Sequence, residues 1–217
     1  MAYKAIIAGA SGLIGSNLLN ILLQEQQYDE VLILVRKELP IQHKKLVQLV
    51  IDFDDLDKHA SALTGHALFC CLGTTRHKTP DKEQYWKIDH DYPLHLAQLA
   101  KQNGVSQFHL VSSIGANAKS STFYIKLKGA VEQDIQKLNL DVLHIYQPSM
   151  LIGDRKDSRL EEKIVSGIFK VIDPLLIGGL KKYRSIKAST VANAMYKKSL
   201  ETDTGTFIHT SDKIQTI

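Results

Sequence analysis

A tyrosine and a lysine stand four positions apart, at 124 and 128, within the run STFYIKLKG. If this run is helical, positions i and i+4 share a face, so the phenol and the ammonium reach a common site. A phenol with an unperturbed pKa of about 10 exchanges protons poorly at neutral pH, and a neighbouring ammonium favours the phenolate. The pair is typical of a site in which Tyr124 protonates the oxygen of a carbonyl that accepts a hydride, with support from Lys128.

Two serines, Ser112 and Ser113, end the apolar run QFHLVSS shortly before the tyrosine. A strand here would bring both hydroxyls to the carboxyl edge of a sheet, where ligands bind in open α/β folds. A hydroxyl at that edge can stabilise negative charge on the substrate oxygen. The tyrosine–lysine spacing alone is a weak signal, because such pairs occur by chance in many helices, and the serines strengthen it.

A glycine-rich stretch, AIIAGASGLIGSNLL, leads from a predicted strand directly into a predicted helix. Its glycines have the spacing of a dinucleotide-binding loop. The first makes the tight turn, the second admits the pyrophosphate, and the third lets the helix pack closely on the strand. N–H groups at the helix start then face the anion. We expect the following residues to hold a dinucleotide: Gly9, Ala10, Ser11, Gly12, Leu13, Ile14 and Gly15.

The second predicted strand ends at Arg36 and Lys37, so no carboxylate stands where NAD-binding proteins place one. An Asp or Glu there binds the ribose 2′-hydroxyl of NAD, whereas a guanidinium pairs with the 2′-phosphate of NADP and stacks on adenine. We therefore expect NADP(H) rather than NAD(H) as the cofactor.

Two further stretches are expected to border this cofactor. Asp52 and Phe53, after the third predicted strand, offer a carboxylate and a flat ring to the adenine, although Asp52 fits an ordinary loop carboxylate equally well. The small residues of CLGTT, after the fourth predicted strand, suit a backbone that passes beneath the nicotinamide ribose. The cofactor-binding residues expected here are Cys71, Leu72, Gly73 and Thr74.

The elements that must position these residues alternate along the chain, since short apolar runs are separated by segments of helical period. This pattern predicts βαβ units and a doubly wound α/β fold with a mainly parallel sheet. The predicted strands are 3–8, 30–35, 45–51, 67–72, 107–113, 141–146 and 205–210, and the predicted helices are 13–26, 92–103, 122–138, about 158–172 and 190–201.

The length of 217 residues is typical of one domain. Within this single domain, 1–217, we expect residues 1–147 to form the nucleotide-binding core. Residues 148–217 should form a small cap on the substrate side, together with the last helix and strand.

Composition narrows the classes of partner. The formal charge of +4 comes without a long basic block, so we expect no nucleic acid as a partner.

Cys70 and Cys71 lie in an apolar run, which favours buried reduced thiols over a disulfide or metal site. The N-terminus resembles neither a signal peptide nor a membrane span, so we expect a cytoplasmic location without membrane contact. We expect a monomer or homodimer. The expected partner is a small carbonyl compound.

Together these residues resemble the short-chain dehydrogenase/reductase superfamily. FCCLGTTR, DHDYPLHLAQLAK, VSSIGANAKSSTFYIKLKGAVE and PSMLIGDRKDSR are similar to its atypical branch that includes the Tat-interacting oxidoreductases, and the likeness covers nearly the whole chain. It implies a Rossmann fold, NADPH binding and a Ser-Tyr-Lys set carried by Ser112 or Ser113, Tyr124 and Lys128. It also implies that three residues after the sixth strand approach the nicotinamide: Pro148, Ser149 and Met150.

The chain departs from the family pattern at two places. The serine-to-tyrosine spacing is slightly short, and Ser113 is the favoured serine. The asparagine that many members carry on the preceding helix has no clear equivalent, since Asp89 stands near that position. The expected function is an NADP(H)-dependent oxidoreductase. The alternatives are an NADPH-binding regulator with little turnover and a nucleotide-sugar epimerase, against which the short C-terminal part argues.

Overall fold

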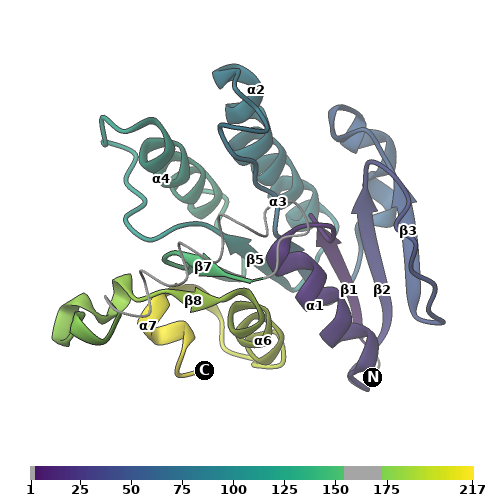
Figure 1. Cartoon of the computed structure of the whole chain (residues 1–217). Helices are drawn as coiled ribbons and strands as arrows, with labels where there is room; N and C mark the ends of the chain where they lie inside the picture. The colour runs from purple at the N-terminus through teal and green to yellow at the C-terminus, as the bar shows by residue number, and fades with distance from the viewer. Residues whose placement is uncertain (1–2, 154–172) are drawn as a thin grey trace.

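The computed structural model describes residues 3–153 and 173–217, and the predicted helix at about 158–172 lies outside these ranges. Seven strands form one sheet in the order β3-β2-β1-β4-β5-β6-β9 (Figure 1). All its strand pairs are parallel. The strands are β1 (Tyr3–Ala8), β2 (Tyr28–Val35), β3 (Leu46–Val50), β4 (Ala67–Cys70), β5 (Gln107–Val111), β6 (Val142–Gln147) and β9 (Gly205–Thr210). The predicted doubly wound α/β class is confirmed.

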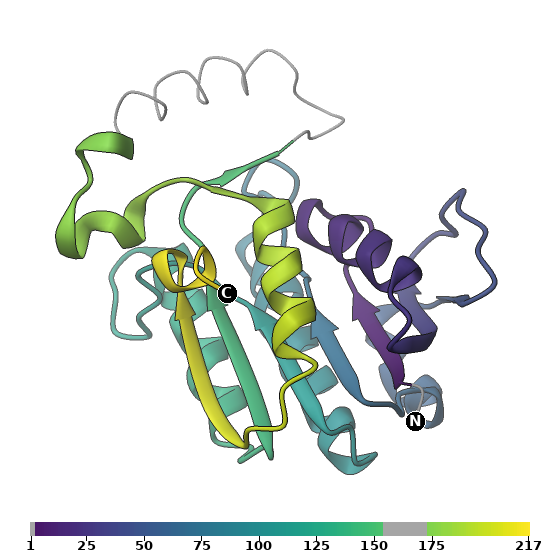
Figure 2. The same cartoon turned by 90° about the horizontal axis from the view of Figure 1, so that it is seen from below.

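Helices cover both faces of the sheet, which is why its central strands are apolar throughout. On one face lie α1 (Leu13–Gln24) and α6 (Ala188–Lys198), packed side by side (Figure 2). Leu18 and Leu22 of α1 share a buried cluster with Val191 and Met195 of α6. On the other face, the 3₁₀ segment η1 (Phe53–Ala62), α3 (Tyr92–Gln102) and α4 (Phe123–Gln136) enclose a second cluster.

One helical stretch is longer than its sequence pattern indicates. The predicted helix begins near residue 92, but the chain is already helical from α2 (Lys82–Trp86), capped by the Asp81 carboxylate. Between α2 and α3 lies a π-helical turn, η2 (Lys87–Asp91). A proline inside an α-helix clashes with the carbonyl four residues earlier. The wider π turn precedes Pro93, and such turns frequently mark functional sites.

The C-terminal part of the chain contributes to one helical layer and to the sheet. α6 packs on α1, and β9 extends the sheet in register with β6. The remaining elements are the short parallel pair β7 (Leu151–Ile152) and β8 (Ile186–Lys187), the 3₁₀ segments η3 (Asp173–Leu175) and η4 (Gly178–Tyr183), and α7 (Ser211–Ile214). The division of the domain at residue 147 stays a prediction. Within the described ranges, no helix combines the length and apolar character that crossing a membrane requires.

Candidate functional site

The candidate site lies at the carboxyl edge of the sheet, where β1, β4, β5 and β6 all end. The strand order reverses between β1 and β4, because the chain after β1 runs to β2 and β3 on one side and to β4 on the other. Ligands of open α/β sheets bind in the crevice at this switch point. Four groups of predicted site residues follow directly on these strands, whereas the adenine-side residues follow β2 and β3, and Tyr124 and Lys128 lie on a helix, α4 (Phe123–Gln136).

The glycine loop after β1 has the close backbone contacts that its spacing predicts. Gly9 has a φ of +89°, and a side chain there would place its Cβ 2.5 Å from the Cys71 carbonyl oxygen. A Cβ on Gly15 would lie 2.2 Å from the Gly9 carbonyl oxygen, while the Gly12 amide donates to that oxygen at 3.0 Å. Positions 9 and 15 therefore exclude any residue larger than glycine.

The start of α1 offers free donors to an anion. Gly12 is its N-cap residue, no side chain caps the helix, and its first turn contains no acidic residue. The amide groups there carry the positive end of the helix dipole. Ala10 and Ile14 are buried, so they can contribute only main-chain atoms. Ser11 is exposed and Leu13 half-buried. This cradle fits the pyrophosphate of a dinucleotide.

The predicted adenine-side residues divide into two groups. Arg36 and Lys37 are exposed after β2, and neither forms an ion pair with another residue of the described ranges. The Asp52 carboxylate accepts the Asp54 amide at 3.0 Å and caps η1. Phe53 is only 6% exposed and packs against the Tyr92 ring at 5.4 Å. Arg36 and Lys37 are therefore available to a ligand, whereas Phe53 serves mainly the core.

Tyr124 and Lys128 lie one turn apart near the start of α4, as their spacing predicts. Tyr124 is 38% exposed, and its hydroxyl forms no hydrogen bond within residues 3–153 and 173–217. Lys128 is 5% exposed, and its ammonium pairs with the carboxylate of Asp89 on η2 at 3.0 Å. The site therefore combines an accessible phenol with a buried, ion-paired ammonium.

Asp89 also binds the loop after β4. Its second oxygen accepts the Thr74 amide at 2.8 Å, and a Cβ on Gly73 would lie 4.0 Å from the Lys128 ammonium. Cys71, at the start of this loop, lies against Gly9 of the glycine loop. The contacts join the β4 loop to both the glycine loop and the tyrosine–lysine helix.

The charges around Lys128 are balanced despite its burial. Burial disfavours the ammonium, but the nearby Asp89 carboxylate and Tyr124 phenol outweigh this effect, and the pKa of Lys128 is raised. On α2, burial raises the pKa of Tyr85 to about 12, and the Asp89 carboxylate contributes to the shift. Lys128 is therefore cationic and Tyr85 neutral at physiological pH.

The two serines after β5 have different surroundings. Ser112 is buried, and its hydroxyl donates to the Glu132 carboxylate on α4. That carboxylate also accepts the Gln147 amide at 3.0 Å. Burial raises the pKa of Glu132, although both hydrogen bonds oppose the shift. Ser113 is half-buried and only 3.5 Å from the Ile114 carbonyl oxygen, a weak contact, which leaves its hydroxyl available to a substrate.

The residues after β6 link the site to the C-terminal segment. Pro148 is buried, and its carbonyl accepts the Ile114 amide at 3.0 Å. The Ser149 hydroxyl donates to the Arg184 carbonyl and lies 2.9 Å from the Ser211 hydroxyl. Met150 is 48% exposed. Ser149 thus has structural partners, whereas the exposed Met150 side chain is open to a ligand.

Gly129 is a contributor that sequence reasoning missed. A Cβ at this position would lie 2.1 Å from the Ala118 amide nitrogen, because the loop after β5 crosses α4 directly beside Lys128. The signal was present: glycine inside a helix costs about 1 kcal/mol relative to alanine, so it indicates close packing. The crossing fixes the Ser113 loop against the helix that carries Tyr124.

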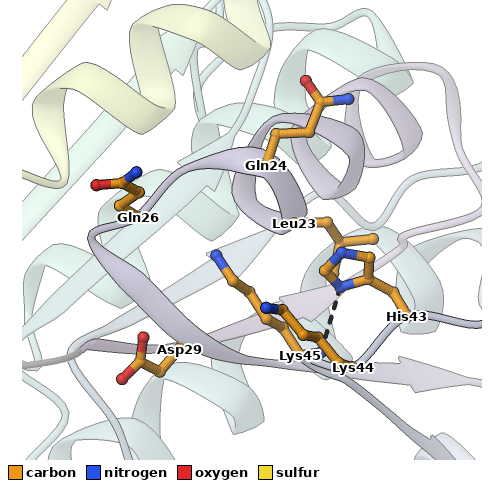
Figure 3. A pocket seen from close by; sticks show the side chains of 7 residues that line it. All are labelled: Leu23, Gln24, Gln26, Asp29, His43, Lys44 and Lys45. Carbon is orange, nitrogen blue, oxygen red and sulfur yellow. Dashed lines mark hydrogen bonds between the residues drawn. The ribbon is translucent and has the colours of Figure 1, made fainter.

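Two surface hollows differ in their relation to the site. One, of about 380 Å³, is bordered by the 115–118 loop and by Gly129, Glu132, Gln133 and Gln136 of α4. The other, of about 520 Å³, lies where α1 ends and β2 begins (Figure 3). There the Lys45 ammonium donates to the Glu25 carbonyl at 2.7 Å, and the C-terminal end of a helix dipole disfavours anions. This second hollow is at the amino edge of the sheet, opposite the candidate site.

Comparison with known proteins shows the family to which the chain belongs. A family model described as NAD(P)H-binding matches residues 9–166. Protein HTATIP2 of Rattus norvegicus is 34% identical over 206 residues, which cover 93% of this chain and 83% of that protein. A protein named FMP52, mitochondrial, from Kluyveromyces lactis is 37% identical over 154 residues, covering 70% of this chain and 69% of that protein. These matches confirm the predicted resemblance to the Tat-interacting branch.

Solved structures share the fold. The enzyme WbmH of Bordetella bronchiseptica, in complex with NAD+, superposes with a TM-score of 0.73 at 17% identity, covering 97% of this chain and 76% of that chain. A UDP-N-acetylglucosamine 4-epimerase from Methanobrevibacter ruminantium gives a TM-score of 0.72 at 18% identity, covering 96% and 76%. At such low identity the likeness concerns the fold alone.

One expectation from the sequence is wrong. We expected a cytoplasmic location, but the matching FMP52 proteins of Saccharomyces cerevisiae, Candida glabrata and Kluyveromyces lactis are all named mitochondrial. The expectations of a small carbonyl partner, of no nucleic acid or membrane partner, and of a monomer or homodimer stay predictions.

Proposed function

We propose that this chain, which belongs to the NAD(P)H-binding family, is an oxidoreductase that transfers a hydride between NADP(H) and a small carbonyl or alcohol substrate. The observation that carries the proposal is the pairing on α4 of an exposed Tyr124 phenol with a buried Lys128 ammonium, tied through Asp89 to the β4 loop. A proton donor, a fixed positive charge and a dinucleotide cradle then meet at one edge of the sheet.

The chain offers a separate element to each part of the cofactor. The amides at the start of α1 suit the pyrophosphate, and Arg36 with Lys37 suits the 2′-phosphate of the adenosine ribose. Gly73 and Thr74 would pass beneath the nicotinamide ribose. The bound cofactor supplies the hydride donor or acceptor, which no side chain of the twenty amino acids can replace.

The remaining chemistry falls to the side chains. As negative charge develops on the substrate oxygen, Tyr124 donates its proton there, and the neighbouring Lys128 ammonium stabilises the phenolate that remains. Ser113 donates a hydrogen bond to the same oxygen. Two of the three Lys128 donor hydrogens are not required by Asp89, so the lysine can also orient the cofactor ribose.

The choice of cofactor has its own test. Arg36→Asp should weaken NADPH binding and move the ratio of the NADPH and NADH dissociation constants toward NADH, because a carboxylate repels the 2′-phosphate. Lys44→Asp, an equal charge change at an exposed lysine by the amino-edge hollow, is the matched control. A ratio that moves equally in both variants would argue against a role for Arg36.

The reaction is tested by NADPH oxidation with a broad panel of carbonyl compounds. Tyr124→Phe should lower the turnover about 10²- to 10⁴-fold, as expected for the loss of a general acid. Tyr3→Phe, at a half-buried tyrosine that begins β1 at the amino edge of the sheet, should leave it unchanged. Tight NADPH binding without turnover of any compound would instead indicate a regulatory binding protein. Turnover without net NADPH oxidation would indicate an epimerase-like reaction.

A further inference from the structure

The ion pair between Asp89 and Lys128 is among the most completely buried charge pairs in the described structure. The two side chains are 1% and 6% exposed, and their charged atoms lie 3.0 Å apart. By contrast, Lys87 and Asp54 also form an ion pair, but these side chains are 40% and 50% exposed. A buried pair contributes little net stability, yet removing one partner leaves an uncompensated charge inside the protein.

The geometry explains why a carboxylate stands at this position. One oxygen of Asp89 accepts from the Lys128 ammonium, and the other accepts the Thr74 amide at 2.8 Å. A carboxylate can accept from both groups at once, whereas an asparagine has one acceptor oxygen and an NH₂ group that would face the other donor. Asparagine therefore cannot replace Asp89 without leaving one buried donor unpaired.

We infer that Asp89 is a positioning residue of the site: it keeps the buried Lys128 charged and in place beside Tyr124, and it anchors the β4 loop to the same point. This inference rests on the proposed function for its chemical purpose, because the lysine charge matters only if Tyr124 gives up a proton. Its physical content, that Lys128 owes its charge to Asp89, stands on the contacts alone.

The other groups around Lys128 cannot take over this role. The titratable groups that act on it or feel its charge are Asp89 on η2, Tyr124 and Glu132 on α4, Cys70 on β4 and Tyr85 on α2. Burial raises the pKa of both Cys70 and Tyr85 to about 12, so these two groups are neutral at physiological pH. Glu132 already accepts hydrogen bonds from Ser112 and Gln147. Asp89 is therefore the one carboxylate of this set that pairs with the ammonium.

Loss of Asp89 should make the Lys128 ammonium a stronger acid. A buried lysine without a partner is a much stronger acid than a solvated one, by 3 to 5 pKa units in extreme cases. In Asp89→Asn we expect the titration midpoint of Lys128 to fall by at least about two pH units from its value in the native chain. The lysine would then lose its charge at a pH at least about two units below the pH at which the native chain loses it.

The experiment follows Lys128 by NMR in protein carrying ¹³C-labelled lysine, without added cofactor. Its side-chain resonance is assigned by its loss in Lys128→Arg, and its midpoint is measured in the native chain, in Asp89→Asn and in Asp54→Asn. The last variant removes the exposed carboxylate that pairs with Lys87, and the Lys128 midpoint should not move. A folded Asp89→Asn protein whose Lys128 midpoint moves by less than half a pH unit would overturn the inference.

A second variant keeps the inference open to refutation if Asp89→Asn does not fold. The double variant Asp89→Asn with Lys128→Met removes the charge along with its partner, so it should fold even where the single variant fails. A double variant that stays unfolded would show that Asp89 serves the fold through Thr74 or other contacts rather than through Lys128.

The two hypotheses fail separately. If the native chain oxidises no NADPH with any carbonyl compound, the proposed function fails, while the Lys128 titration still decides what Asp89 does. If the native chain turns over but Asp89→Asn retains both its turnover and its Lys128 midpoint, only the inference about Asp89 fails.

Discussion

Acidification should destabilise this protein through a row of buried histidines. His109 on β5, His144 on β6 and His209 on β9 are 0%, 2% and 8% exposed. Their rings stack in sequence, with centroids 4.8 Å apart for the first pair and 5.3 Å for the second. His144 and His209 share a hydrogen bond of 3.0 Å, and His109 is hydrogen-bonded to Tyr146 at 3.1 Å. Protonating any of them places a cation beside other buried rings.

The direction of the effect follows from the shifted pKa values. Burial lowers the pKa of His144 to about 3 and that of His209 to about 4, and it lowers the pKa of His109 well below its usual range. The unfolded chain binds protons on these residues from about pH 6.5 downward, while the folded chain does not. The stability they contribute is therefore fully present above about pH 6.5 and is lost as the pH falls toward the folded pKa values.

The magnitude is large compared with the stability of a typical domain. At pH 5 each unfolded histidine gains about 2 kcal/mol from protonation, since 1.4 kcal/mol corresponds to one pH unit. The three together cost about 6 kcal/mol, against a usual total of about 5 to 15 kcal/mol. The pKa of Glu132 is raised in the folded chain, so its protonation favours the folded state as the pH falls. This gain offsets at most the loss from one of the three histidines.

Urea unfolding between pH 7.5 and 5, followed by circular dichroism, measures this dependence. Between pH 6 and 5 we expect the free energy of unfolding to fall by about 4 kcal/mol per pH unit, and by about 1.4 kcal/mol per unit less in His144→Phe. His77→Gln, at an exposed loop position, should leave the slope unchanged. The reasoning would be refuted by a native slope below about 1.4 kcal/mol per pH unit, which corresponds to one proton. It would also be refuted if His144→Phe had the same slope as the native chain.

Two further predictions concern the frame of the site. Gly129→Ala adds a methyl group 2.1 Å from the backbone of the loop after β5, so the free energy of unfolding measured in urea should fall by about 3 kcal/mol. Gly179→Ala, at a position in open space, should change it by less than about 0.5 kcal/mol. Equal losses in the two variants would contradict the packing argument. Ser112→Ala should cost about 1 to 3 kcal/mol of stability because Glu132 loses a donor, whereas Ser113→Ala should retain stability and lower kcat about 100-fold. Full kcat in Ser113→Ala would exclude that serine from the reaction.

The sheet was predictable because burial on both faces requires strands that are apolar throughout. β1 and β9 have the predicted bounds, and the other predicted strands overlap the observed ones to within two residues at each end. The π-helical turn at Lys87–Asp91 was not predictable, since it depends on how the helix accommodates Pro93 against the rest of the molecule. A pattern of local hydrophobicity contains no such information.

The site was only partly predictable for the same reason. The alternation of side chains along β5 places Ser112 on the same face as Phe108 and Leu110, toward α4, and this period of two could have separated it from Ser113. Asp89 was recognised as standing near a family position, but its pairing with Lys128 joins elements 39 residues apart in sequence. Such a contact follows from packing and not from spacing.

The transfer of a hydride is the central claim, and isotope transfer tests it most directly. NADPH carrying deuterium at both C4 positions of the nicotinamide is incubated with the chain and a carbonyl compound, and the alcohol product is analysed by mass spectrometry. The account predicts one deuterium on the carbinol carbon with the native chain and a product yield reduced about 100-fold or more in Tyr124→Phe. Alcohol without deuterium, or an equal yield from Tyr124→Phe, would contradict it.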